Sequence, residues 1–373
     1  MSTGAAITLA AVGDISFADN AISVGHGVRT QFERVAALEP LYPFTHVSAL
    51  FTGADVVFGN LETVISDAGR QAGRLESLEM RGCADGATRL RDAGFSVINV
   101  ANNHILQHGA IAFEETVQNL QREGLAVVGL ARPDRRGTVR RMVQTNGLRL
   151  AFLGYAFEPD RYFFDPPLYA FGPTADIAAD VRAARADADV VICSVHWGDE
   201  FVRYPSPDEV SLGHAMIDAG AHLVLGHHPH VLRGVERYKE GVIAYSLGNF
   251  VFDMPWDEHL RRGAVLFFTI GRNGIVEVRP EFVWIGDDYQ PRPVDGFAAE
   301  QATRAWADVM QWATAVPARE TYNRDRVLAA KTNRYQSWRY FSRTLFRRQP
   351  GMTAQMLTRT ARRKMRIRLP LDA

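Results

Sequence analysis

The chain has 373 residues and a mass of 41.5 kDa, with 47% hydrophobic and 23% charged residues, so it can bury a core as one large domain with an appendage or as two smaller domains. Its apolar runs are too short to span a bilayer, and its two cysteines, Cys83 and Cys193, are too few for a disulfide framework or a four-cysteine zinc site. The composition therefore excludes a membrane protein, a disulfide scaffold, a zinc finger and a disordered chain.

Charge is divided unevenly along the chain. Residues 1–300 contain 26 Lys and Arg against 38 Asp and Glu, whereas residues 301–373 contain 16 against 4. The formal net charges of these two parts are −12 and +12. This change predicts two regions, an acidic body over residues 1–295 and a basic helical extension over residues 296–373.

Six segments of the body are apolar runs that stop at a polar cluster. Runs of this length are typical of strands buried on both faces of a sheet. In chain order they are Ala6–Val12 before Gly13-Asp14, Val56–Phe58 before Gly59-Asn60-Leu61-Glu62, Ser96–Val100 before Asn102-Asn103-His104, Val190–Val195 before His196-Trp197-Gly198-Asp199-Glu200, His222–Leu225 before Gly226-His227-His228-Pro229-His230, and Val242–Leu247 before Gly248-Asn249.

Helical patterns alternate with these strands and predict an α/β layered fold, in which ligands bind beyond the carboxyl ends of the strands. The helical patterns cover Phe113–Glu123, Ile177–Ala188 and Leu212–Ala219. After them, Asn273-Gly274 predicts a hairpin of Gly263–Ile270 and Ile275–Trp284 that closes the core as an antiparallel edge. Gly296–Ala315 and Arg324–Arg347 are predicted helices, the second with an apolar stripe made of Val327, Tyr335, Trp338, Phe341 and Leu345.

Three histidines lie within four residues, at His227, His228 and His230. If this segment is extended, His228 and His230 point to the same side, because side chains alternate along a strand. Neutral imidazoles are ligands of Zn²⁺, Mn²⁺ and Fe²⁺. The His-x-His pair therefore predicts a metal site, and its alternative is a hydrogen-bonded histidine pair without a metal.

Other strand ends carry further ligand types. Asp14, Glu62 and His196 each follow a buried strand, where an unpaired charged group would be costly. Asn103 adds an amide oxygen, and its neighbour His104 is suited to general acid catalysis. Convergence of these groups on a metal, whose bound water would have a pKa near ~7, would explain their positions.

These motifs, together with Tyr245-Ser246-Leu247-Gly248-Asn249-Phe250, resemble the CapA family of capsule, or poly-γ-glutamate, biosynthesis proteins. That family is similar to the calcineurin-like metallophosphoesterases. The resemblance runs from about residue 6 to residue 253 in the expected order, and the last third of the chain is outside it. It implies a four-layer α/β sandwich of the metallophosphoesterase kind, with metals at the strand ends.

The resemblance also implies roles for single positions. Asp14 and His230 would bind a first metal, and Glu62 or Asn60 would bridge to a second. The second metal would be held by Asn103, His196 and His228, and His104 would protonate the leaving group. Residues expected to support the ligands or to contact substrate are Asn60, Asn102, Glu200, His227 and Asn249.

Three departures from the family patterns affect the expected metal count. The phosphoesterases have Asp-x-His in the first motif, and this chain has Asp14-Ile15-Ser16, so the first metal loses an imidazole. Asn60 replaces the usual aspartate before Glu62, and Gln107 stands where an aspartate often follows the Asn-Asn-His cluster. One or two divalent ions of Mn, Zn or Fe are therefore expected.

The favoured function is a metal-dependent hydrolase that attacks a phosphoester or a γ-glutamyl amide in capsule or poly-γ-glutamate synthesis or processing. One alternative is a non-catalytic accessory protein that binds an anionic polymer or a synthase partner. Another is a small-molecule phosphatase outside capsule synthesis. The expected substrates are thus an anionic polymer or a small phosphorylated or glutamyl compound.

Three interpretations of the basic tail stay open. It is a solvated helical face, or it docks on the acidic body or on a second copy, or it binds an anionic polymer or a membrane surface. No nucleic-acid motif accompanies the charge, so no nucleic-acid partner is expected. We see no signal peptide and no membrane anchor in the sequence and expect a cytoplasmic protein without transmembrane segments.

Overall fold

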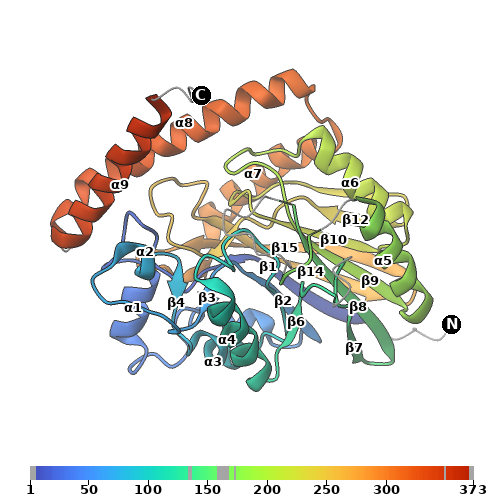
Figure 1. Cartoon of the computed structure of the whole chain (residues 1–373). Helices are drawn as coiled ribbons and strands as arrows, with labels where there is room; N and C mark the ends of the chain where they lie inside the picture. Colours follow the sequence, from blue (N-terminus) through green and yellow to red (C-terminus); the bar gives the residue numbers. More distant parts are fainter. Residues whose placement is uncertain (1–5, 133–136, 158–167, 172–173, 348–349, 369–373) are drawn as a thin grey trace, which may run out of the picture.

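The protein is built around two β-sheets that pack face to face (Figure 1). The computed structural model describes residues 6–132, 137–157, 168–171, 174–347 and 350–368. Within these residues, no helix combines the length and the apolarity needed to cross a bilayer.

The first sheet has eight strands, and its central part is parallel. In spatial order the strands are β16 (Pro291–Pro293), β15 (Gly274–Ile285), β14 (Arg262–Gly271), β1 (Ile7–Ile15), β2 (Val56–Leu61), β5 (Val97–Asn99) and β6 (Ala126–Val128), and β13 (Asn249–Val251) also pairs with β1. The β14–β15 hairpin confirms the predicted one. It is not the edge of the sheet, however, because β16 adds one more antiparallel strand to β15.

The second sheet has six strands, with four parallel strands in the middle. Their order is β11 (Val235–Tyr238), β12 (Gly241–Ala244), β10 (Leu223–His227), β9 (Val190–His196), β8 (Leu148–Ala156) and β7 (Arg141–Thr145). A small separate sheet pairs β3 (Val64–Ile65) with β4 (Arg81–Gly82).

Helices cover the outer faces of both sheets, which makes four layers. The first sheet is covered by α1 (Val28–Val35), η1 (Ser48–Phe51), α2 (Leu75–Leu78), α3 (Gly86–Asp92) and α4 (Gly109–Arg122), and the second by α5 (Thr174–Asp187) and α6 (Pro207–Asp218). Alternation along β1 shows why its sequence is apolar throughout, since Leu9 faces the other sheet and Ala10 faces the helices. The predicted four-layer α/β sandwich is confirmed.

The basic C-terminal region is helical and lies against the body. It comprises α7 (Gly296–Thr314), α8 (Arg319–Arg343), η2 (Leu345–Arg347) and α9 (Pro350–Arg368), drawn in orange and red in Figure 1. Residues 348–349 and 369–373 of the predicted extension lie outside the described residues. On α8 only Phe341 of the predicted apolar stripe is fully packed, whereas Val327 and Tyr335 are 49% and 63% exposed.

Arginines of this region pair with acidic groups of the body. Arg319 contacts Asp208 at 2.6 Å, and Arg359 donates to Glu79 at 2.8 Å. Of the three interpretations of the tail, the structure thus shows contact with the acidic body. The packing adds to the charge pairing, because Phe341 and Met356 share a small apolar cluster with Leu75 of α2.

Candidate metal centre

A row of polar side chains crosses the first sheet at the carboxyl ends of its strands. The backbone register places Asn249 opposite Asp14, Asp14 opposite Asn60, and Asn60 opposite Asn99. The amide of Asn99 donates to Asn60 Oδ1 at 2.8 Å, and the amide of Asn60 donates to Asp14 Oδ1 at 2.8 Å. Both ends of the Asn60 amide are thus engaged in hydrogen bonds inside the sheet, and Glu62 is not part of this row.

Glu62 lies just beyond this row and is completely buried. Its backbone N–H donates to Ile15 O at 2.9 Å, which ties it to the end of β1. Within the described part of the chain, neither carboxylate oxygen of Glu62 has a hydrogen-bond partner. A buried carboxylate in this state is costly unless a cation or a proton compensates it.

The second sheet contributes imidazoles from β9 and β10. The register places His196 beside His227, and both are fully buried. His196 Nε2 lies 2.9 Å from Asn103 Oδ1, which leaves its buried Nδ1 without a partner among the described residues. His227 Nδ1 lies 3.3 Å from Asp14 Oδ1, behind the row described above.

His228 and His230 follow β10 in a bent segment, so the extended conformation on which the sequence argument was conditional is not the one that they adopt. Their φ angles are +94° and +59°, in the left-handed region that residues other than glycine rarely adopt. The bend nevertheless brings both side chains to the same place. Such backbone strain persists only where surrounding contacts fix it, and it is concentrated at functional sites.

The surroundings of the bend supply those contacts. His230 Nδ1 lies 2.9 Å from Asn249 Oδ1, while its Nε2 lies 3.5 Å from Glu62 Oε1. The backbone N–H of His228 donates to Asp14 Oδ2 at 3.2 Å. Further on, the buried Arg233 pairs with Glu209 at 2.5 Å and donates to Val202 O at 2.8 Å, which fixes the exit of the loop.

Two groups of ligand atoms result, and they share Glu62. Asp14, Glu62 and His196 form one group, and Glu62, His228 and His230 form the other, with the atoms of each group within 4.8 Å of one another. Two ligand atoms at ~2.1 Å from one ion lie roughly 3–4 Å apart, so this spacing suits a bound cation. The unpartnered buried atoms on Glu62, His196 and His228 are the ones that a cation would satisfy.

Proton affinities in the metal-free centre differ from group to group. Although burial opposes it, the charges of Glu62 and Asp14 raise the pKa of His230 to about 10, so this imidazole must lose a proton when a metal binds. Burial, helped by the charges of Asp14 and Glu200, raises the pKa of Glu62 well above its usual range. Burial is also the main reason that the pKa values of His196 and His228 are well below the usual range, so both imidazoles are neutral, the form that binds metals. Although burial opposes its ionisation, hydrogen bonds from His227 and His230 hold the pKa of Asp14 well below its usual range.

The remaining predicted residues lie around the cluster rather than in it. Asn102 donates to Leu61 O at 2.8 Å and accepts from the backbone of His104 at 3.1 Å, so it shapes the loop after β5. His104 is half-buried, and its Nδ1 lies 3.0 Å from the side-chain amide oxygen of Gln107. Glu200 is half-buried and acts on Glu62 through its charge.

Ser16, which stands where the phosphoesterases have a histidine, does not face the cluster. Its Oγ lies 3.3 Å from Thr63 Oγ1 and accepts a hydrogen bond from the backbone of Ala18. The position therefore supplies no ligand to the Asp14 group. The imidazole in that group comes from the opposite sheet and is His196.

Two supporting residues escaped the sequence analysis. Asn99 lies inside a predicted strand, and the only signal was that a polar residue interrupts an apolar run. Its side-chain amide packs directly against Gly154. A residue with a side chain at position 154 would place its Cβ atom 2.3 Å from Asn99 Oδ1, so the glycine makes room for the amide. Arg233 gave no signal at all, because its partner Glu209 is distant in sequence from the histidine motif.

Known proteins match this chain over the region that contains the cluster. Residues 8–254 match the model of the family described as bacterial capsule synthesis protein PGA_cap. The capsule biosynthesis protein CapA of Bacillus anthracis is 33% identical over 68% of this chain and 63% of its own length, and the PGA biosynthesis protein CapA of Bacillus subtilis is 30% identical over 70% and 69%. The chain thus spans less than two thirds of the B. anthracis relative.

Among solved structures, the 5'-nucleotidase of Candida albicans aligns with 82% of this chain and 58% of its own chain. The identity is 10% and the TM-score is 0.43.

Proposed function

The chain belongs to the family of bacterial capsule synthesis proteins, and from this premise we propose that its strand-end cluster is the centre of a metal-dependent hydrolase. The hydrolase would act in the synthesis or processing of capsule or poly-γ-glutamate. The scissile bond would be a phosphoester or a γ-glutamyl amide. The relatives named above support the biological context, and the geometry of the cluster supports the chemistry.

One observation carries this proposal: Glu62 is common to both ligand groups, fully buried, and without a hydrogen-bond partner in the described part of the protein. A purely structural carboxylate at this depth would be expected to pair with an arginine, as Glu209 does with Arg233. A site for divalent cations instead explains why neither oxygen accepts a hydrogen bond from the described residues, with His230 Nε2 at 3.5 Å from one of them. The oxygen and imidazole ligands suit Mn²⁺, Zn²⁺ or Fe²⁺.

In this proposal the residues of the cluster would bind the cation, and His104 beside it would donate the proton. A divalent cation at the centre would supply a Lewis acid and a hydroxide-like nucleophile at neutral pH. Asp14, Glu62, His196, His228 and His230 would hold it. His104 is outside both ligand groups and half-buried, and Gln107 fixes the orientation of its ring. In this proposal it would hold the proton that a leaving group needs.

The test is to substitute His104 with Gln in the metal-loaded protein and to follow a phosphoester and a γ-glutamyl anilide substrate. Loss of a general acid is expected to lower kcat about 10²–10⁴-fold. Elemental analysis should show an unchanged metal content, because His104 is in neither ligand group. Unchanged turnover in this variant, or loss of the metal with it, would contradict the assigned role.

A second candidate function is a non-catalytic accessory protein that binds an anionic polymer or a synthase partner. The observation that favours it is Ser16, which offers no ligand where the phosphoesterases have an imidazole. In that case the metal would stabilise the fold. Removal of the metal by a chelator would then lower the melting temperature without changing any turnover, whereas a hydrolase loses turnover on the same treatment.

A further inference from the structure

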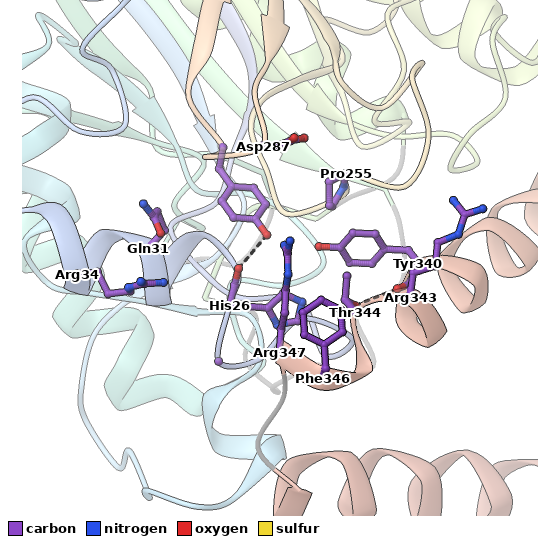
Figure 2. A pocket seen from close by; sticks show the side chains of 12 residues that line it. His26, Gln31, Arg34, Pro255, Asp287, Tyr340, Arg343, Thr344, Phe346 and Arg347 are labelled. Carbon is purple, nitrogen blue, oxygen red and sulfur yellow. Dashed lines mark hydrogen bonds between the residues drawn. The ribbon is translucent and has the colours of Figure 1, made fainter.

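A second cavity lies away from the metal centre, between the body and the C-terminal helices (Figure 2). Its volume is about 710 Å³. The body side is lined by the loop before α1, by Gln31 and Arg34 of α1 and by Tyr289, and the other side by the end of α8 and by η2. A ligand in this cavity would therefore touch α1 and the end of α8, which are more than 300 residues apart in sequence.

The cavity carries an excess of positive charge. Arg34 faces it from α1, Arg343 from the end of α8, and Arg347 from η2. In Figure 2 Arg34 and Arg347 extend toward the middle from different sides, while Arg343 lies at the edge. The one acidic residue of the lining, Asp287, pairs with Arg261 at 2.7 Å. Over the described ranges, none of the three arginines forms an ion pair.

Other contacts between the tail and the body are different. Arg319 meets Asp208 at 2.6 Å, Arg326 meets Asp199 at 3.4 Å, and Arg359 donates to Glu79 at 2.8 Å. At these three places the body provides a carboxylate for each arginine of the tail. At the cavity it provides Arg34, which adds positive charge instead of cancelling it.

The remaining walls are aromatic and well anchored. Tyr289 is buried, and its hydroxyl donates to His26 O at 3.0 Å. Tyr340 also lines the cavity, and Phe346 lies at its margin with 80% of its surface exposed. Thr344 is buried and donates to Tyr340 O at 2.9 Å, which holds the turn from α8 into η2. The shape is thus fixed by packing, while the arginine charges stay uncompensated.

We propose that this cavity binds a short segment of a carboxylate-bearing polymer, of the poly-γ-glutamate type. Planar guanidinium groups bind carboxylates through paired hydrogen bonds, and arginines on different sides of the cavity require a ligand with more than one carboxylate. The choice of a glutamate polymer rests on the proposed function. A volume of about 710 Å³ is within the usual range for small-ligand sites.

The chain connects this cavity to the metal centre. Phe252 packs against His230, with the ring centres 4.6 Å apart, and Pro255, three residues later, lines the cavity. A polymer segment held here would be bound next to the segment that supports the metal centre. The cavity would therefore retain the polymer, and the metal centre would carry out the chemistry.

The experiment measures the Kd of a fluorescent γ-linked glutamate oligomer for the full chain. The variants are Arg34→Ala and Arg347→Ala, and Arg339→Ala is the matched control, since it removes the same charge from α8 outside the cavity lining. Each cavity variant should weaken binding by about tenfold or more, the effect of losing a charge-assisted hydrogen bond. The control should stay within about twofold, as expected for a screened surface charge. Unchanged thermal melting shows that the variants are folded.

Several outcomes would overturn the proposal. They are no binding of the oligomer, an equal loss in Arg339→Ala, or tighter binding of inorganic tripolyphosphate than of the oligomer. Glu62→Gln separates this proposal from the hydrolase proposal. If it leaves the oligomer affinity unchanged while the cavity variants reduce it, the cavity proposal holds whether or not the wild-type chain turns over any substrate.

Discussion

The two sheets contribute different chemistry to the metal centre. The first sheet and its loops provide carboxylate and amide oxygens, among them those of Asp14, Glu62 and Asn103, whereas the second sheet and the loop after β10 provide the imidazoles of His196, His228 and His230. Groups of the first sheet bond to one another, as Asn60 does with Asp14. The imidazoles instead find their partners across the seam between the sheets.

Because these contacts cross between the sheets, the site can form only when the two sheets pack together. His196 meets Asn103, and His230 meets Asn249 and Glu62, each from the opposite sheet. The apolar core between the sheets, which includes Leu9 and Ile192, must therefore be packed before the ligands converge. We conclude that the metal centre is a product of the packing of the two sheets and that neither sheet contains it alone.

The largest expected effect comes from Glu62→Gln, because Glu62 joins both ligand groups at the seam. The amide keeps the shape of the side chain and removes the negative charge. We expect metal affinity to fall by more than about 100-fold, since changes behind a ligand already cost about 10–100-fold. Metal content after dialysis is the measurement.

The control for this variant is the metal-free protein. Burial without a partner disfavours the Glu62 carboxylate, so the free energy of unfolding of the metal-free Gln variant should be equal to or higher than that of the wild type. A strongly destabilised metal-free variant would show that Glu62 has a structural role that the two ligand groups do not explain.

A smaller effect is expected from Asn249→Ala, which removes the acceptor that orients His230 across the seam. Metal affinity should fall about 10–100-fold. Asn99→Ala is the matched variant within one sheet, and it acts on Asp14 only through Asn60. Isothermal titration with Mn²⁺ should show the larger loss for Asn249→Ala, and the reverse order would argue against the importance of the seam.

Much of this architecture could be predicted from the sequence. Strands buried on both faces are apolar throughout, so their ends were visible as polar clusters. Because ligands of α/β folds bind beyond the carboxyl ends of the strands, Asp14, Glu62 and His196 were expected to lie near one another. Family motifs then pointed to the roles that we propose. The helices of the tail were visible as well, because their periodic patterns do not depend on the rest of the chain.

Other features depend on contacts that no local pattern contains. The left-handed bend at His228 and His230 is held by Asp14 and Asn249, from two other segments, and by Arg233, which ties the end of the loop to Val202. The apolar stripe on α8 said nothing about what covers it, and Val327 is in fact half exposed. The arginine-lined cavity forms only where α1 and η2 meet. In the sequence, its arginines were visible only as part of the basic net charge of the tail and of the arginines of the body, with nothing to show that they lie together.

A buried carboxylate in the loop after β13, outside the ligand groups, gives a prediction about pH. Burial and the charge of Asp19 raise the pKa of Asp253 to about 7. Between pH ~4 and ~7 the folded chain keeps a proton on Asp253 that the unfolded chain has released, so stability falls as the pH rises through this range. Asp253→Asn should remove this component, on the order of a few kcal/mol, in urea unfolding at pH 5 and pH 8.

Metal loading is the control for Asp253. Because Asp253 belongs to neither ligand group, the difference between Asp253→Asn and wild type should be the same with and without metal. If the difference disappears on metal loading, the protonation of Asp253 is coupled to metal binding, and Asp253 must be counted among the groups of the metal centre.

The smallest effect is expected at the junction of the tail and the body. Arg359 pairs with Glu79, which is 8% exposed, so Arg359→Ala should lower the free energy of unfolding by about 1 kcal/mol. Arg319→Ala breaks a pair in which both side chains are more than half exposed, and its effect should be close to zero. Thermal melting compares the two, and an equal loss would show that burial of Glu79 does not strengthen its pair.

Metal binding by the wild-type chain and by two single variants tests the central claim most directly. We would purify the protein without added metal, reconstitute it with Mn²⁺ or Zn²⁺, and measure bound metal in wild type, Asp14→Ala and His228→Ala. We expect bound metal in the wild type and less bound metal in both variants, because each variant removes one ligand, Asp14 from the first sheet and His228 from the loop after β10. A wild-type chain that binds no metal under these conditions would contradict the account.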